Sequence, residues 1–129
     1  MAVFTVAEAR AELVRLLPLL EEIVRLRADS AELAASTRAR TAPSPLGGLA
    51  ELKAAQARLD ELLTEVTGCG VELKGLAPLL LDFPAMLDGT PVLLCWLEGE
   101  GELAWFHRTD LGFAGRRRLA DPDHPGAHP

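Results

Sequence analysis

The spacing of apolar residues changes once along this chain, close to Gly68, and this change constrains the fold more than any other feature. Before it, leucines recur at intervals of three and four residues, as on one side of an α-helix. After it, apolar residues form short runs separated by glycine and proline, as in antiparallel strands joined by turns. The chain is therefore predicted to be α+β, with a long antiparallel helical hairpin over residues 5–68 packed on a small antiparallel β-meander of three to four strands over residues 71–108.

Local signals mark the ends of the predicted helices. Thr5 and Glu8 fit a capping box, so the first helix is expected to begin there. Pro18 falls inside its pattern and predicts a kink or a helix restart. A second helix is expected from about residue 49 to residue 67, and its apolar seam contains one polar member, Gln56. This seam fits an ordinary core between two helices, or a four-helix arrangement of two subunits in which Gln56 sets the register.

The expected strands cover residues 71–73, 79–83, 91–98 and 102–108, with a tight turn at Asp88-Gly89. Alternation in the last two strands places apolar residues on both faces of the sheet. One helical hairpin covers one face, so the other must meet a second subunit or the chain's own loops. A homodimer is therefore predicted, and its interface candidates are Trp96, Phe106, Trp105 and Gln56.

Composition narrows the class of protein. The chain has 129 residues, 49% of them hydrophobic, which suits one globular domain over residues 1–120 and a loosely held tail over residues 121–129. A formal charge of −6 argues against nucleic acid as a partner. The sequence contains neither a signal peptide pattern nor an apolar run that is long enough to span a membrane.

Two cysteines are too few for a disulfide framework and suit a reducing compartment, so the expected location is the cytoplasm. The chain lacks Asn and Tyr and prefers Arg to Lys, which is typical of a GC-rich bacterial genome.

One group of residues is a candidate ligand or metal site. His107 shares a face with Cys95 if the strands pair regularly, Asp110 follows three residues later, and Asp82 lies on a neighbouring strand. Imidazole, thiolate and carboxylate are all suitable ligands of a divalent metal. The alternative is a structural histidine held by hydrogen bonds, because the chain has no CxxC or HExxH motif.

A second group is basic. Residues 109–119 are predicted to form a turn rich in glycine and arginine, in which Arg116, Arg117 and Arg118 join Arg108 as candidates for binding an anionic ligand or an acidic partner. The alternative is a solvated run of charge in an acidic protein. No Walker or dinucleotide-binding motif is present.

Six short motifs resemble one known family when they are taken together. They are Phe4-Thr5 with Glu8-Ala9-Arg10, Gly70-Val71-Glu72-Leu73-Lys74, Asp82-Phe83-Pro84, Leu94-Cys95-Trp96, Trp105-Phe106-His107 and Gly112-Phe113-Ala114-Gly115-Arg116. This order is similar to that of a prokaryotic family of small uncharacterised proteins, domain of unknown function 2203. The resemblance spans nearly the whole chain. It implies no activity or catalytic residue, and it directs attention to the region from Cys95 to Arg116.

Two hypotheses follow for function. The first is a cytoplasmic homodimeric interaction or regulatory module without catalytic activity, which acts on a protein partner. The second is a protein that binds a small molecule or a metal, conceivably an enzyme, through His107, Asp110, Cys95 and the Arg116–Arg118 run. The sequence alone identifies neither a cofactor nor a catalytic residue.

Overall fold

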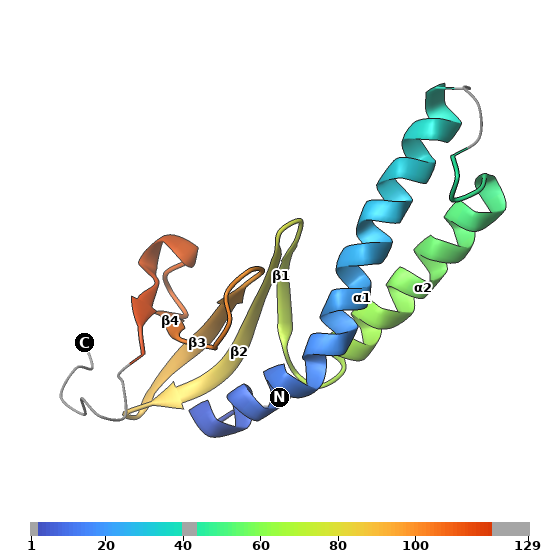
Figure 1. The fold of residues 1–129 in the computed structure, drawn as a ribbon. Helices are drawn as coiled ribbons and strands as arrows, with labels where there is room; N and C mark the ends of the chain where they lie inside the picture. Colours follow the sequence, from blue (N-terminus) through green and yellow to red (C-terminus); the bar gives the residue numbers. More distant parts are fainter. Residues whose placement is uncertain (1–2, 40–43, 120–129) are drawn as a thin grey trace. The chain divides into compact units, whose positions relative to one another are not determined.

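The computed structural model describes residues 3–39 and 44–119. It contains two α-helices and a five-stranded sheet, so the α+β prediction is confirmed, and the sheet exceeds the three to four strands expected (Figure 1). The predicted tail, residues 121–129, lies outside the described residues. The elements are α1 (Val6–Ala39), α2 (Leu49–Thr67), β1 (Glu72–Leu76), β2 (Leu79–Leu87), β3 (Thr90–Leu97), β4 (Trp105–Arg108), the 3-10 helix η1 (Phe113–Gly115) and β5 (Arg117–Arg118).

The chain divides into two compact units. Residues 16–66 form the helical unit, and the described residues before 16 and after 66 form the sheet unit. The first turns of α1 therefore belong with the sheet, and the rest of α1 belongs with α2. A single domain over residues 1–120 stays a prediction. No helix in the described segments is both long enough and apolar enough to cross a membrane.

The capping box predicted at the start of α1 is confirmed. The backbone N–H of Glu8 donates to the Thr5 hydroxyl at 3.0 Å, and the N–H of Thr5 donates to the Glu8 carboxylate at 2.8 Å. These bonds satisfy two amide groups that a helix start leaves without partners. Farther along, α1 continues through Pro18, so the helix does not restart there.

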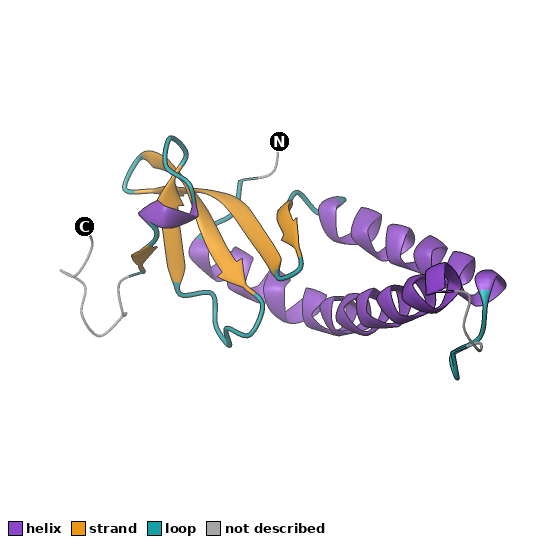
Figure 2. Cartoon of the chain, turned by 90° about the horizontal axis from the view of Figure 1, so that it is seen from above, coloured by secondary structure: helices purple, strands orange, loops and turns teal. Residues whose placement is uncertain are grey.

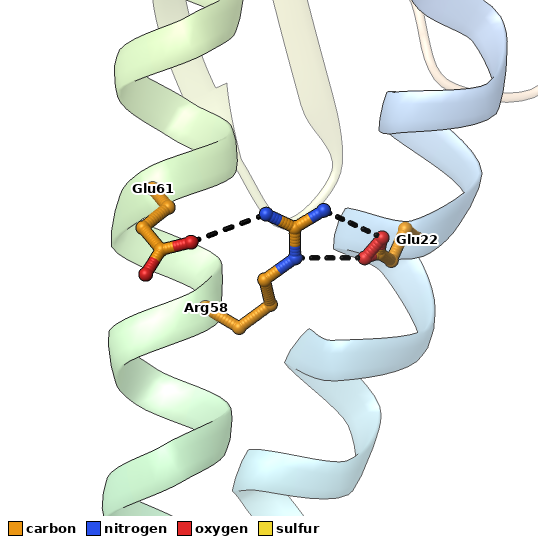
Figure 3. Close-up of polar contacts among 3 residues, drawn as sticks. All are labelled: Glu22, Arg58 and Glu61. Atoms are coloured by element: carbon orange, nitrogen blue, oxygen red, sulfur yellow. Dashed lines mark hydrogen bonds and ion pairs between the residues drawn. The ribbon is translucent and has the colours of Figure 1, made fainter.

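An ion-pair bridge joins the two helices of the helical unit (Figure 3). The Arg58 guanidinium in α2 donates to both Glu22 carboxylate oxygens of α1, at 3.1 and 3.2 Å, and to Glu61 at 3.2 Å. Leu52, Leu62 and Val66 are the buried side chains of α2. Gln56 is exposed on the same helix. It therefore stays out of the hairpin core, and its role in a four-helix arrangement stays a prediction.

The sheet is an antiparallel meander in the order β1-β2-β3-β4-β5 (Figure 2). The predicted turn between β2 and β3 is present: Asp88 and Gly89 have φ values of 51° and 78°, as a two-residue hairpin of matching twist requires. β4 begins at Trp105 rather than at residue 102, and β5 lies inside the segment that was predicted to be a turn.

The prediction that the second strand ends before Pro84 is wrong, because β2 continues through Pro84 to Leu87. The N and C=O of one residue in a strand point toward the same edge. The Pro84 carbonyl accepts a hydrogen bond from Phe4 N at 2.7 Å, on the edge away from β3. The missing N–H of Pro84 points there too, so no hydrogen bond between β2 and β3 is lost.

The two faces of the sheet differ in chemistry. One face is buried and apolar over most of its area, and the exposed Thr90, Arg108 and Arg117 lie on the same face. Its buried residues are Leu79, Leu81, Phe83, Ala85, Val92, Leu94, Trp96 and Phe106. Figures 1 and 2 both show the first turns of α1 alongside the sheet, and the Phe4 ring meets the Phe83 ring edge-on at 5.5 Å. The side chains predicted to need a cover, Leu94, Trp96 and Phe106, are thus buried within one chain. The opposite face, called the polar face below, carries the buried polar side chains Asp82 and His107.

Candidate metal centre

Three potential metal ligands come together on the polar face of the sheet. Asp82 projects from β2, Cys95 from β3 and His107 from β4. Asp82 pairs directly with Cys95, and His107 pairs with Leu93, two residues from Cys95. Because side chains alternate along each strand, this register places all three on one face. They are 2%, 0% and 5% exposed. The predicted proximity of Cys95, His107 and Asp82 is therefore realised.

The hydrogen bonds of His107 define which ring nitrogen carries a proton. Its Nδ1 lies 2.9 Å from the Arg108 carbonyl oxygen, which can only accept, so Nδ1–H is the donor. The other nitrogen, Nε2, lies 3.1 Å from Asp82 Oδ2. Both Nε2 and the Asp82 carboxylate oxygens are atom types that can act as metal ligands.

The Asp82 carboxylate is only half satisfied. Its Oδ1 atom is buried and has no hydrogen-bond partner among the described residues. A buried oxygen of this kind is costly when unpartnered, by about 1–3 kcal/mol, and such cases call for an explanation. A group bound beside the carboxylate would supply the missing partner. The Cys95 thiol is the next side chain across the strand pair and interacts with the Asp82 carboxylate, so a cation held between the two groups would contact both.

The donor atoms are close enough to hold one ion. The carboxylate oxygen, the Cys95 Sγ and the imidazole nitrogen all lie within 4.8 Å of one another. Bonds of about 2.0–2.3 Å to a tetrahedral zinc ion would place such atoms roughly 3.3–3.8 Å apart. Binding of one ion therefore requires the donor atoms to move closer together. The Nδ1–H bond to a backbone carbonyl is also the contact that orients metal-binding histidines.

The environment of Cys95 disfavours ionisation of its thiol. Burial and, to a smaller extent, the nearby Asp82 carboxylate raise the pKa of Cys95 to about 12, against the opposing effect of the Arg116 guanidinium. A thiol with this pKa is neutral at neutral pH and is a poor nucleophile. The Cys95 thiol would therefore be a poor nucleophile even with His107 as its base. A bound metal ion, in contrast, would displace the thiol proton.

A pocket opens over this cluster on the polar face. Its volume is about 350 Å³. Asp82 and His107 form part of its lining, and Cys95 does not. Its other walls come from β1, from β2 and β3, and from the segment after β4; these lining residues are Lys74, Leu80, Leu93 and Thr109 to Phe113.

The segment after β4 is held over the polar face by Arg116. The Arg116 guanidinium lies 4.8 Å from the Trp105 ring centre and 4.7 Å from the Phe113 ring centre. It also donates to the Glu100 carboxylate at 2.6 Å and to the Cys95 carbonyl at 3.3 Å. The planar guanidinium of arginine can stack against aromatic rings while its N–H groups donate charge-assisted hydrogen bonds. The ammonium group of lysine cannot do both.

The four candidate arginines do not form one anion site. Arg116 is enclosed on the polar face, and Arg118 lies 5.7 Å from the Trp105 ring there. The strand register puts Arg108 and Arg117 on the opposite face, where both border a different pocket. Arg108 pairs with Asp110 at 2.9 Å, and both side chains are exposed. Asp110 therefore lines the first pocket without joining the three buried ligands.

The interface candidates are distributed unevenly. Trp96 and Phe106 are buried inside the sheet unit, which leaves little of either side chain for a partner. Trp105 is partly exposed beneath Arg116, and Gln56 lies on the exposed side of α2.

Sequence reasoning missed two functional neighbours. Lys74 lines the pocket, and Glu100 anchors Arg116 while also accepting from the N–H of Leu97 at 2.7 Å. No local pattern points to either residue. Arg116 and Glu100 are 16 residues apart, and only the strand reversals bring them together.

Comparisons with other proteins agree with the motifs. A family model described as an uncharacterized conserved protein, DUF2203, matches residues 2–119. No curated protein and no solved structure gives a match. Because the family model covers most of the chain and spans all three buried ligands, this protein belongs to the DUF2203 family.

Proposed function

We propose that this protein binds a divalent transition-metal ion, with zinc as the best fit, through Asp82, Cys95 and His107. The observation that carries the proposal is the convergence of three buried donors, one of which has an oxygen without a partner among the described residues. Burying three such groups together is unfavourable unless they bind one another fully or bind an ion.

The donor chemistry selects the metal. Thiolate and imidazole favour zinc over magnesium or calcium, which prefer oxygen alone. The charges of one thiolate and one carboxylate balance a divalent cation. Three protein ligands leave a fourth position open, as in catalytic rather than structural zinc sites.

The test is a zinc titration of the protein after treatment with chelator and reductant. Calorimetry is expected to give one ion per chain, and zinc at about a hundred times its dissociation constant should raise the free energy of unfolding by about 2.7 kcal/mol. Cys95→Ser and His107→Gln should each weaken binding by more than about a hundredfold, since loss of outer partners alone costs 10- to 100-fold.

Cys69→Ser is the matched control, because Cys69 is the other cysteine and lies outside the cluster. Circular dichroism checks that each variant folds, and Asp82→Asn provides a further ligand variant if one of the others does not. Failure of the wild-type protein to bind zinc, or equal zinc affinity for the Cys95→Ser and Cys69→Ser variants, would contradict the proposal. His107 would then be a structural histidine.

A homodimeric interaction or regulatory module, as expected from the sequence, stays a second proposal. Support comes from the exposed apolar side chains Leu111 and Phe113 beside the partly exposed Trp105. Its test, the mass in solution, is given below.

A further inference from the structure

The coordination position that the protein leaves open faces the pocket. All three ligands project from one face of the sheet, so an ion at their tips has the strands beneath it. On the Cys95 side, Trp105 and Arg116 occupy the space above the sheet. On the other side, Asp82 and His107 border the 350 Å³ pocket. The remaining direction for a fourth ligand is therefore into that pocket.

The pocket wall has two kinds of surface. Leu80, Leu93, Leu111 and Phe113 supply apolar area, and the last two are 42% and 45% exposed. Exposed apolar side chains gathered around one cavity mark a binding surface rather than ordinary surface. Lys74 and Asp110 supply the charged part of the wall, and the Lys74 ammonium group pairs with Glu72 at 2.9 Å.

We infer that the pocket binds a small organic acid, whose carboxylate completes the coordination of the metal and whose hydrocarbon part contacts Leu93, Leu111 and Phe113. This inference rests on the proposed metal site. An anionic oxygen suits the open position of a divalent cation, and the apolar side chains of the wall suit the hydrocarbon part of the acid. The volume sets the size, because about 350 Å³ is at the lower end of cavities that enclose small molecules.

The experiment uses the full chain loaded with Co²⁺, whose visible absorption reports changes in coordination. Acetate and hexanoate are titrated separately against this protein. Both acids present the same carboxylate, so their difference measures the apolar wall alone. Each fully buried methylene is worth about fourfold in affinity. Hexanoate, with four more methylenes partly buried, should bind at least about tenfold more tightly than acetate.

Two variants locate the site. Leu111→Ser should reduce the preference for hexanoate, whereas Leu46→Ser, at a residue of similar exposure that does not line the pocket, should retain it. Leu93→Trp should fill the cavity and abolish the hexanoate response while cobalt remains bound.

The outcomes separate the two levels of the argument. Cobalt that binds but responds equally to both acids, or a Leu111→Ser variant that behaves like Leu46→Ser, would overturn the pocket inference and leave the metal site standing. A protein that takes up no cobalt and no zinc would overturn the proposed function itself, and the pocket inference with it.

Discussion

His107 Nε2 lies 3.1 Å from Asp82 Oδ2, and both side chains are buried on the polar face of the sheet. In the metal-free protein this contact gives His107 Nε2 and Asp82 Oδ2 a partner, while Asp82 Oδ1 has none among the described residues. Loss of one partner leaves the other buried and unsatisfied, which costs more than the pair itself contributes.

The first prediction concerns this pair. In metal-free protein, His107→Phe should lower the free energy of unfolding by about 1–3 kcal/mol, because Asp82 then has no partner for either oxygen. The double variant Asp82→Leu with His107→Phe should recover part of the loss, since no polar group remains unsatisfied. Urea unfolding measures both. Asp110→Asn is the control: it breaks the exposed pair with Arg108 and should cost less than about 1 kcal/mol. An equal loss of unfolding free energy for His107→Phe and Asp110→Asn would contradict the prediction.

The second prediction concerns Arg116. Arg116→Lys should destabilise the protein by about 1–2 kcal/mol, because lysine cannot stack flat between Trp105 and Phe113 while bonding Glu100. The segment over the pocket should loosen as well, which faster amide exchange at residues 111–116 would reveal. Arg117→Lys, an exposed neighbour, should stay within about 0.5 kcal/mol of wild type. Indistinguishable urea midpoints for these two variants would show that the stack contributes nothing.

The third prediction is a dependence of stability on pH. In the metal-free folded protein burial raises the pKa of Cys95 to about 12, whereas the unfolded thiol ionises near 9.0. The unfolded state therefore loses its proton first, and the contribution of Cys95 to stability is present below pH 9 and is lost as the pH rises toward 12. Between these values, wild-type stability should fall relative to Cys95→Ala by up to about 1.4 kcal/mol per pH unit.

Denaturant titrations at several pH values, with chelator and reductant present, measure this slope. Cys69→Ala should change the slope less, because the Cys69 thiol is only partly buried. Parallel stability profiles for wild type and Cys95→Ala would mean that Cys95 ionises alike in both states.

The fourth prediction is the homodimer expected from the sequence. Light scattering after size-exclusion chromatography at micromolar concentration should give twice the chain mass of 13.8 kDa. If the exposed Phe113 contributes to the contact, Phe113→Ser should shift the equilibrium toward monomer, because loss of a buried aromatic anchor weakens an interface by about 2 kcal/mol or more. Exposed Val14, on α1, gives a matched control as Val14→Ser. A folded monomer at these concentrations would refute the dimer.

Part of the candidate site could be predicted from the sequence. Side chains alternate between the two faces along each strand, so Cys95 and His107 lie on one face when β3 and β4 pair. The turn at Gly99 makes that pairing antiparallel. Asp82 could be only a candidate, because its strand was expected to end at Pro84 and its register with β3 depends on the hairpin at Asp88-Gly89. Asp110 was grouped with them by distance along the chain, yet it turns outward to Arg108.

The sequence by itself determined the features that depend on near neighbours. The capping box at Thr5, the helical periodicity up to Thr67 and the turn at Asp88-Gly89 all use interactions between residues a few positions apart. Only the tertiary structure decided that β2 passes through Pro84, because Phe4 supplies the edge partner. It also decided that Arg116 stacks inward while Arg117 faces the other side. Both features depend on contacts between residues that are far apart in the sequence. The number of residues between two such positions does not predict whether they meet in the folded sheet.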